Sequence, residues 1–437
     1  MSTQTVLPID RASLVEQSKA RREPEWMTAL REEALELAGS LELPKLEKTR
    51  IDRWNLQSFG NYKPVKAARS LDELPAEAKS LLQNEGQGQP DNLLVQHNSG
   101  VIYSSISESL KRQGVIFTSL EEALNLHGDL VKPYFMSVVD KSENRLTALH
   151  TALWSGGVFL YVPKNVQVEV PVQALFITDD GEAVFSPHVL IVAEQHASVT
   201  YVENFISQGK LNGLVYNGVA EVVVKPEAKV TFASVHNLDE SVTNLTYRRA
   251  VVENDASVEW IIGEMHYGNA MSDTTTLLKG KGSNSDAKVI CVGTEDQKLN
   301  VTTRAVHFGK HSESNMITRA VMRDTATAIF NGVTKIEKGA TKANGEQTEK
   351  VLMLSPKARG DANPILLIDE DDVKAGHAAS VGQVNPEQVY YLMSRGISKQ
   401  EAERLIIYGF LDPVVSKIPL EQIGSQLRQL VERKLGQ

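Results

Sequence analysis

The chain has 437 residues, a net charge of -9 and a sequence pI of about 5.7, which argue against nucleic acid or an anionic membrane as its main partner. Its apolar runs are shorter than the roughly 18 residues of a membrane-spanning helix. The single cysteine, Cys291, excludes intrachain disulfides and metal sites made of cysteines alone. The N-terminal residues lack the pattern of a secretory signal, so we expect a cytoplasmic protein. The chain is also longer than one hydrophobic core normally serves.

Residues 1–140 predict an N-terminal region of mixed, largely helical structure. Apolar residues at helical spacing follow Pro24 and stop near Gly39. Short strands are expected at 93–95 and 101–103, and Ser119 with Glu122 forms a capping box. This region carries no pattern that points to catalysis.

Residues 141–383 predict a β core, because short β-rich runs alternate there with turn residues and no helix of ordinary length interrupts them. Four stretches align on Ala197, Ala228, Ala256 and Ala287, at spacings of 31, 28 and 31 residues. A period of about 30 without crossover helices predicts a parallel β-helix built of stacked turns. A large β-sandwich with fortuitous hairpins is the alternative. The repeat weakens after residue 300, and the apolar run 365–368 is expected to be the last, fully buried strand.

Residues 384–437 predict a C-terminal helical region. Asn385 and Ser398 are N-cap residues of two helices, and Pro386 fits the first helical position. A third helix is expected from about Leu420. These helices are short and apolar on one side, so part of that surface is expected to cover the β core and part to receive a partner.

The segment between the last expected strand and these helices holds the main candidate site. Four acids, Asp369, Glu370, Asp371 and Asp372, precede a stretch of small residues that contains His377. A lone histidine is more often structural than a ligand. The four acids have two interpretations: they could contribute to a site, or they could form a solvated edge. Small neighbours would nevertheless let a ligand or a partner chain approach this imidazole closely.

The sequence gives only weak signals for other metal-binding or catalytic sites. His307 and His311 have the spacing of a metal-binding pair on a helix, but a glycine between them is not a helical context. Cys291 lies in an alternating strand pattern typical of a buried thiol. The chain contains neither a phosphate-binding loop nor a nucleophile elbow.

Several motifs together resemble the SufB/SufD family, the scaffold proteins of the SUF iron–sulfur cluster assembly system. They are D-D-V-K-A-G-H-A-A-S-V-G-Q at 371–383, then Y-L-M-S-R-G-I at 391–397, E-A-E-R-L-I-I-Y-G-F at 401–410, and L-T-A-L-H-T-A-L-W-S-G-G-V-F-L-Y-V-P-K at 146–164. The likeness extends over nearly the whole chain, most clearly to the SufD branch, and its core is a parallel β-helix. One departure is Ala375, where family members often carry a cysteine two residues before the histidine.

The resemblance implies a non-catalytic scaffold in a complex with a SufB-like paralogue and the SufC ATPase. The two β-helices would pair side by side and hold a transient Fe–S cluster at their interface, with His377 and partner cysteines as ligands, and the isolated chain would bind no cofactor tightly. The C-terminal helices would dock the ATPase. The residues expected at that docking surface are Tyr391, Arg395, Leu405, Tyr408 and Phe410. Whether the isolated chain forms a homodimer, and whether flavin binds the complex, stay open.

Two alternatives come from other functional classes. A β-helix carbohydrate-active enzyme would need a cleft of carboxylates with raised pKa values and activity in the isolated chain. A purely structural subunit would leave His377 without a role.

Overall fold

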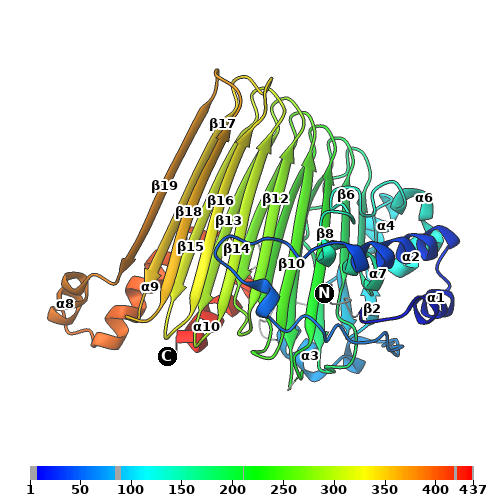
Figure 1. Cartoon of the computed structure of the whole chain (residues 1–437), viewed down its shortest axis with the longest axis horizontal. Coiled ribbons are helices and arrows are strands. Elements are labelled where there is room, and N and C mark those ends of the chain that lie inside the picture. Colours follow the sequence, from blue (N-terminus) through cyan, green and yellow to red (C-terminus); the bar gives the residue numbers. More distant parts are fainter. Residues whose placement is uncertain (1–6, 84–89, 210, 418–420, 436–437) are drawn as a thin grey trace.

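The computed structural model describes residues 7–83, 90–209, 211–417 and 421–435, and it shows a parallel β-solenoid with helical regions at both termini (Figure 1). The predicted fold class is confirmed. Two sheets form the walls, one of ten strands in the order β19-β17-β15-β13-β11-β9-β7-β5-β1-β2 and one of nine in the order β18-β16-β14-β12-β10-β8-β6-β4-β3. Successive strands alternate between the sheets, so each pair makes one turn of the solenoid.

The solenoid strands run from β4 to β19. They are β4 (Gly157–Val162), β5 (Val172–Thr178), β6 (His188–Ala193), β7 (Ser198–Ser207), β8 (Val215–Val224), β9 (Lys229–Asn237), β10 (Thr243–Val252), β11 (Ser257–Glu264), β12 (Ala270–Leu278), β13 (Asn284–Gly293), β14 (Lys298–His307), β15 (Glu313–Met322), β16 (Thr327–Ile336), β17 (Asn344–Met353), β18 (Arg359–Ile368) and β19 (Lys374–Gln383).

A sharp corner repeats once in every turn and fixes the period. Its left-handed residue is His196, Glu227, Asp255, Gly282, His311 or Lys342, at intervals of 27 to 31 residues. The next residue is always a buried Ala or Ser, because only a small side chain fits inside the corner. Ala197, Ala228 and Ala256 therefore mark equivalent positions, as predicted. The alignment of Ala287 was wrong: it lies within β13 beside Trp260, and Ser283 occupies the equivalent corner.

The expected weakening of the repeat after residue 300 was also wrong. Strands β14 to β19 have ten residues each and pair in register. The apolar run 365–368 forms the second half of β18, and Ile365, Leu367 and Ile368 are exposed instead of fully buried. Burial was misjudged because no further turn covers this strand.

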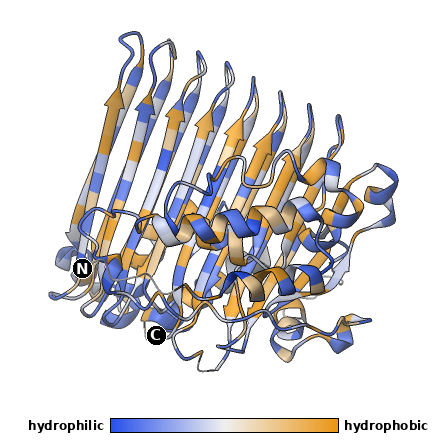
Figure 2. Cartoon of the chain, turned by 45° about the vertical axis from the view of Figure 1, so that its right-hand side comes forward, coloured by the Kyte–Doolittle hydropathy of each residue, from blue (hydrophilic) through white to orange (hydrophobic). Residues whose placement is uncertain are grey.

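Alternating side chains fill the inside of the solenoid, which we call the lumen. Its apolar core runs from Leu94 and Phe117 at one end to Val351 and Ala358 near the other. Figure 2 shows hydrophobic and hydrophilic residues mixed along the strands, as expected for strands that present one side inward and the other outward.

The N-terminal region covers one outer face and closes one end. Its elements are α1 (Arg11–Ala20), α2 (Glu25–Ser40), α3 (Ala76–Gln83), α4 (Glu108–Arg112), α5 (Leu120–Leu126), α6 (Gly128–Val131), α7 (Arg145–Leu153), the 3-10 helices η1 (Ile51–Arg53) and η2 (Leu71–Glu73), and the strands β1 (Leu93–His97), β2 (Gly100–Ser105) and β3 (Ile116–Ser119). Ser119 caps α5 as predicted, accepting a hydrogen bond from Glu122 N–H. Helices α2 and α7 pack on the nine-stranded sheet through apolar residues of β8, β10 and β12.

The C-terminal region contains α8 (Pro386–Ser394), α9 (Lys399–Val415) and α10 (Glu421–Leu435). Asn385 and Ser398 cap α8 and α9, as predicted. Leu420, the expected start of the third helix, lies outside the described residues. Helices α9 and α10 cover the outer face of the ten-stranded sheet, where Ile407 and Leu411 of α9 and Leu430 of α10 join its apolar side chains.

Candidate functional site at the open end of the solenoid

The two ends of the solenoid differ. At the N-terminal end, β3 pairs antiparallel with β4, and β1 and β2 extend the other sheet. At the opposite end, β18 and β19 are the outermost strands of their sheets, and within the described residues no strand pairs with their outer edges (Figure 1). Stacked-repeat proteins normally cap their terminal units, so an uncapped end with exposed backbone is a candidate interface.

The backbone pattern shows which groups of β19 face outward. Lys374 N–H donates to the carbonyl oxygen of Ala343, the residue just before β17. In a parallel ladder, the N–H and C=O of one residue both point to the same neighbouring strand, and those of the next residue point the opposite way. His377, Ala379 and Val381 therefore turn their backbone groups to the open edge.

The same reasoning sets β18 apart. Arg359 N–H donates to the carbonyl oxygen just before β16, and Asp369 N–H donates to the last residue of β16. Odd-numbered residues of β18 therefore face β16, and residue 364 belongs to the outward-facing set. That residue is Pro364, which has no N–H to offer a further strand, and proline tolerates only such edge positions. Of the two edges, β19 thus presents the longer uninterrupted row of donors and acceptors.

His377 lies within the ten-residue strand β19, so its expected placement between the last strand and the C-terminal helices was wrong. It is in register with Gln347 of β17. Val351 of β17 belongs to the lumen core, so Glu349 and Gln347, two and four residues before it, also point inward. His377 therefore faces the lumen, and it is exposed because it stands in the last turn. We call this opening, between β18 and β19, the mouth.

Small residues surround His377 on the same strand face. Ala375 and Ala379 flank it there, two residues away on each side, and both are exposed. The position at which family members often carry cysteine is thus next to His377 on the mouth side, and here it offers only a methyl group.

The acidic run does not reach His377. It forms the turn between β18 and β19, and the strand from Asp372 to His377 spans roughly 16 Å. Lys342 Nζ lies 2.8 Å from Asp372 Oδ1, and Lys338 Nζ lies 3.7 Å from Glu370 Oε2. Of the two interpretations left open by the sequence, a solvated and paired edge fits this geometry.

Beneath His377, the floor of the mouth is polar. The side-chain amide of Gln347 lies 3.2 Å from the hydroxyl of Thr334 across the lumen. Glu349 is only 2% exposed, and burial raises the pKa of its carboxyl group to about 7. Glu349 could not be identified from the sequence, because β17 reads N-G-E-Q-T-E-K-V-L-M and polar residues fall on both of its faces.

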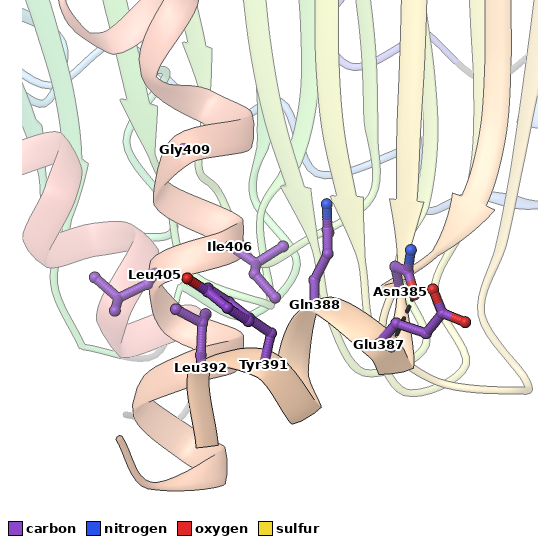
Figure 3. A pocket seen from close by; sticks show the side chains of 8 residues that line it. All are labelled: Asn385, Glu387, Gln388, Tyr391, Leu392, Leu405, Ile406 and Gly409. Carbon is purple, nitrogen blue, oxygen red and sulfur yellow. Dashed lines mark hydrogen bonds between the residues drawn. The ribbon is translucent and has the colours of Figure 1, made fainter. Parts of the chain in front are cut away.

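A second feature lies between α8 and α9. It is an open pocket of about 510 Å³ lined by Asn385, Glu387, Gln388, Tyr391, Leu392, Leu405, Ile406 and Gly409 (Figure 3). Tyr391 and Leu405, two of the predicted docking residues, meet here, and their side chains are 56% and 43% exposed. Arg395 borders them, with its guanidinium 5.2 Å from the centre of the Tyr391 ring.

The other two predicted docking residues face the protein. The Tyr408 hydroxyl donates to Glu432 Oε1 of α10 at 2.6 Å. Phe410 packs against the apolar cluster beneath α9, with the Arg319 guanidinium 5.3 Å from its ring centre. Both residues attach α9 to its surroundings and lie outside the pocket.

Two protein-family models match the chain, one in each part of it. The family model described as "SUF system FeS cluster assembly, SufBD core domain" matches residues 176–410, and "SufBD protein N-terminal region" matches residues 13–174. The chain belongs to the SufBD family. The resemblance inferred from the sequence motifs is therefore confirmed.

Named SufBD relatives cover the chain along its length. The chain is 49% identical to "Iron-sulfur cluster assembly protein SufD" of Bacillus subtilis over all of both chains. It is 30% identical to an "Iron-sulfur cluster assembly SufBD family protein" of Staphylococcus haemolyticus, over 92% of this chain and 88% of the relative. These findings give the chain a part in iron–sulfur cluster assembly of the SUF system.

The remaining sequence candidates are consistent with that assignment. Cys291 is fully buried in β13, as predicted, and burial raises the pKa of its thiol to about 12. His307 is buried and bonded to the hydroxyls of Ser312 and Ser314 at 2.8 Å each, whereas His311 is a solvent-exposed corner residue. Among the described residues, no cluster of three or more His, Cys, Asp or Glu could hold a metal ion, and no helix is long and apolar enough to span a membrane.

Proposed function

We propose that this SufBD protein is a non-catalytic scaffold subunit that pairs through the open end of its solenoid with a SufB-like paralogue. The observation that carries this proposal is the asymmetry of the solenoid: one end is closed by the N-terminal strands, and at the other end no strand of the described residues pairs with the outer edges of β18 and β19. Addition of a partner strand to β19 would satisfy its outward backbone groups. It would also cover the exposed apolar side chain of Val381 on β19.

The cluster would be assembled at this interface, next to His377. Iron–sulfur clusters are held mainly by thiolates, and imidazole is an accepted substitute on iron. The only cysteine of the chain is buried in β13, away from the mouth, so this subunit offers no thiolate there. We infer that His377 supplies one ligand and that the partner supplies the thiolates.

Replacing His377 by alanine is expected to lower sharply the iron and sulfide bound to the purified complex, without preventing its assembly. The imidazole is exposed and lies on the mouth side of an edge strand, so its removal leaves the fold intact. His377→Cys is expected to restore part of the cluster content, because thiolate is the better iron ligand. Iron and sulfide analysis together with subunit stoichiometry measures both effects.

Ser380→Ala is the matched control, since Ser380 lies on the same strand but on its opposite face. It should leave the cluster content unchanged. A normal cluster content in His377→Ala would make the histidine structural and would assign every ligand to the partner.

The pocket between α8 and α9 is proposed to dock the SufC ATPase. It combines exposed apolar side chains with the polar residues Asn385, Glu387 and Gln388 at one end (Figure 3). A partner that inserts an apolar side chain into such a pocket would bury Tyr391 and Leu405. Aromatic residues at the centre of an interface commonly carry much of its binding energy.

Tyr391→Asp and Leu405→Asp are each expected to weaken SufC binding by about tenfold or more, because a charge would have to be desolvated inside the pocket. Tyr390→Asp is the control: Tyr390 is 74% exposed and does not line the pocket. The measurement is the affinity of each variant for purified SufC. If all three variants bind SufC equally, the ATPase docks elsewhere.

A further inference from the structure

Glu349 is an unusual residue for the inside of a solenoid. Its side chain points into the lumen and is 2% exposed, and within the described residues its Oε2 atom has no hydrogen-bond partner. Buried polar atoms are nearly always paired, and an unpaired carboxylate costs folding free energy. A buried group that weakens the fold is a candidate for function.

The fold keeps space for this carboxylate. Gly332 of β16 lies across the lumen from it, and a Cβ atom at that position would come within 1.8 Å of Glu349 Oε1. Any other residue at position 332 would displace the Glu349 side chain. The glycine is therefore part of the arrangement that holds the carboxylate in place.

The neighbouring Gln347 shows what a structural polar residue looks like here. With its amide oriented to satisfy both groups, Gln347 donates to Gly332 O and Thr334 Oγ1 and accepts from Ile365 N–H, at 3.2 Å each. It thereby ties the last turn to the one before. Glu349 makes no such tie, and no lysine or arginine among the described residues forms an ion pair with it.

Glu349 and His377 face the same small space. Glu349 is in register with Ala379, which lies two residues after His377 on the same inward face of β19. The two strands are about 5 Å apart, and the offset along them is about 7 Å. On the side of the mouth, Glu349 has beside it the methyl group of Ala379 on β19 and, across the lumen, Pro364 of β18, which is in register with Gly332. Neither side chain can bind a metal ion, so an ion could lie between the carboxylate and the imidazole.

We propose that Glu349 and His377 together bind a ferrous ion in the mouth of the solenoid. Carboxylate oxygen and imidazole nitrogen are a donor set suited to Fe²⁺. The ion would be cargo, held by two protein ligands and water until the partner's thiolates complete the site. This inference rests on the proposed function, because it gives the iron of the cluster a binding position before assembly.

The test measures Fe²⁺ binding to the full, isolated chain under anaerobic conditions by titration calorimetry, with Fe²⁺ alone as the probe. Wild-type protein is expected to bind one ion. Glu349→Gln, which keeps the shape and removes the charge, and His377→Ala should each weaken binding by about ten- to a hundredfold. Glu346→Gln is the control, because Glu346 lies on the same strand with its side chain exposed on the opposite face.

Equal Fe²⁺ affinity in wild type and Glu349→Gln overturns the inference, as does the absence of binding to wild type. Thermal unfolding of each variant verifies that the solenoid is intact. Gly332→Ala provides a second route, since it displaces the carboxylate without removing it and should also weaken binding. Complex formation with a SufB-like partner is measured separately, so failure of the proposed function is distinguishable from failure of this iron site.

Discussion

Replacing Ala379 by proline is expected to abolish pairing with a SufB-like partner while leaving the monomer folded. The N–H of Ala379 faces the open edge of β19, so its loss removes no hydrogen bond to β17. A partner strand would lose a bond in the middle of the new ladder and would meet the proline ring. Co-purification of the two subunits, with thermal unfolding of the isolated variant, measures the two effects.

Two further variants locate the effect in the edge. Ala379→Ser changes the side chain but keeps the N–H, and it should pair normally. Ala378→Pro removes an N–H that faces β17, so it should loosen β19 itself and lower thermal stability. A complex that still forms with Ala379→Pro would show that pairing does not use the backbone of β19.

Replacing Arg31 by methionine is expected to destabilise the N-terminal region by about 3 to 5 kcal/mol. The Arg31 side chain is fully buried, and it donates to Glu23 Oε1 at 2.7 Å and to Glu23 Oε2 at 2.8 Å. It also donates to Ala152 O and Trp154 O at the end of α7. Methionine would leave the Glu23 carboxylate and two carbonyl oxygens buried without this donor.

Chemical denaturation of wild type and Arg31→Met gives the change in the free energy of unfolding. The control is Arg11→Met, because Arg11 pairs with Glu32 at the surface and its side chain is 75% exposed. That variant should unfold like wild type. A similar small effect for Arg31→Met would mean that water or a rearranged side chain replaces the buried guanidinium.

Much of the fold could be predicted because its signals are local and periodic. The corner that follows each left-handed residue needs a small side chain, so Ala197, Ala228 and Ala256 revealed the period of the solenoid. The N-cap residues Asn385 and Ser398 predicted the starts of two C-terminal helices, because a helix cap is also a local signal. Burial in the last turn could not be predicted, because it depends on whether another turn follows.

The candidate site was predicted only in part. The motif around His377 identified the family, but whether that residue lay in a loop or a strand depended on where the repeat stopped. Its orientation depends on strand register, since a shift of one residue would turn the imidazole to the other face. Glu349 was hidden for the same reason: only its alignment with Val351 and Ala379 shows that it points into the lumen.

The burial of Cys291 makes the chain a convenient background for site-directed thiol chemistry. Because burial raises the pKa of its thiol to about 12, this cysteine should resist alkylation while the protein is folded. A cysteine introduced in place of Ala375 would then be the single accessible thiol, and it would lie at the mouth. Maleimide labelling or crosslinking from that position would report which surfaces approach the mouth, without first removing the native Cys291.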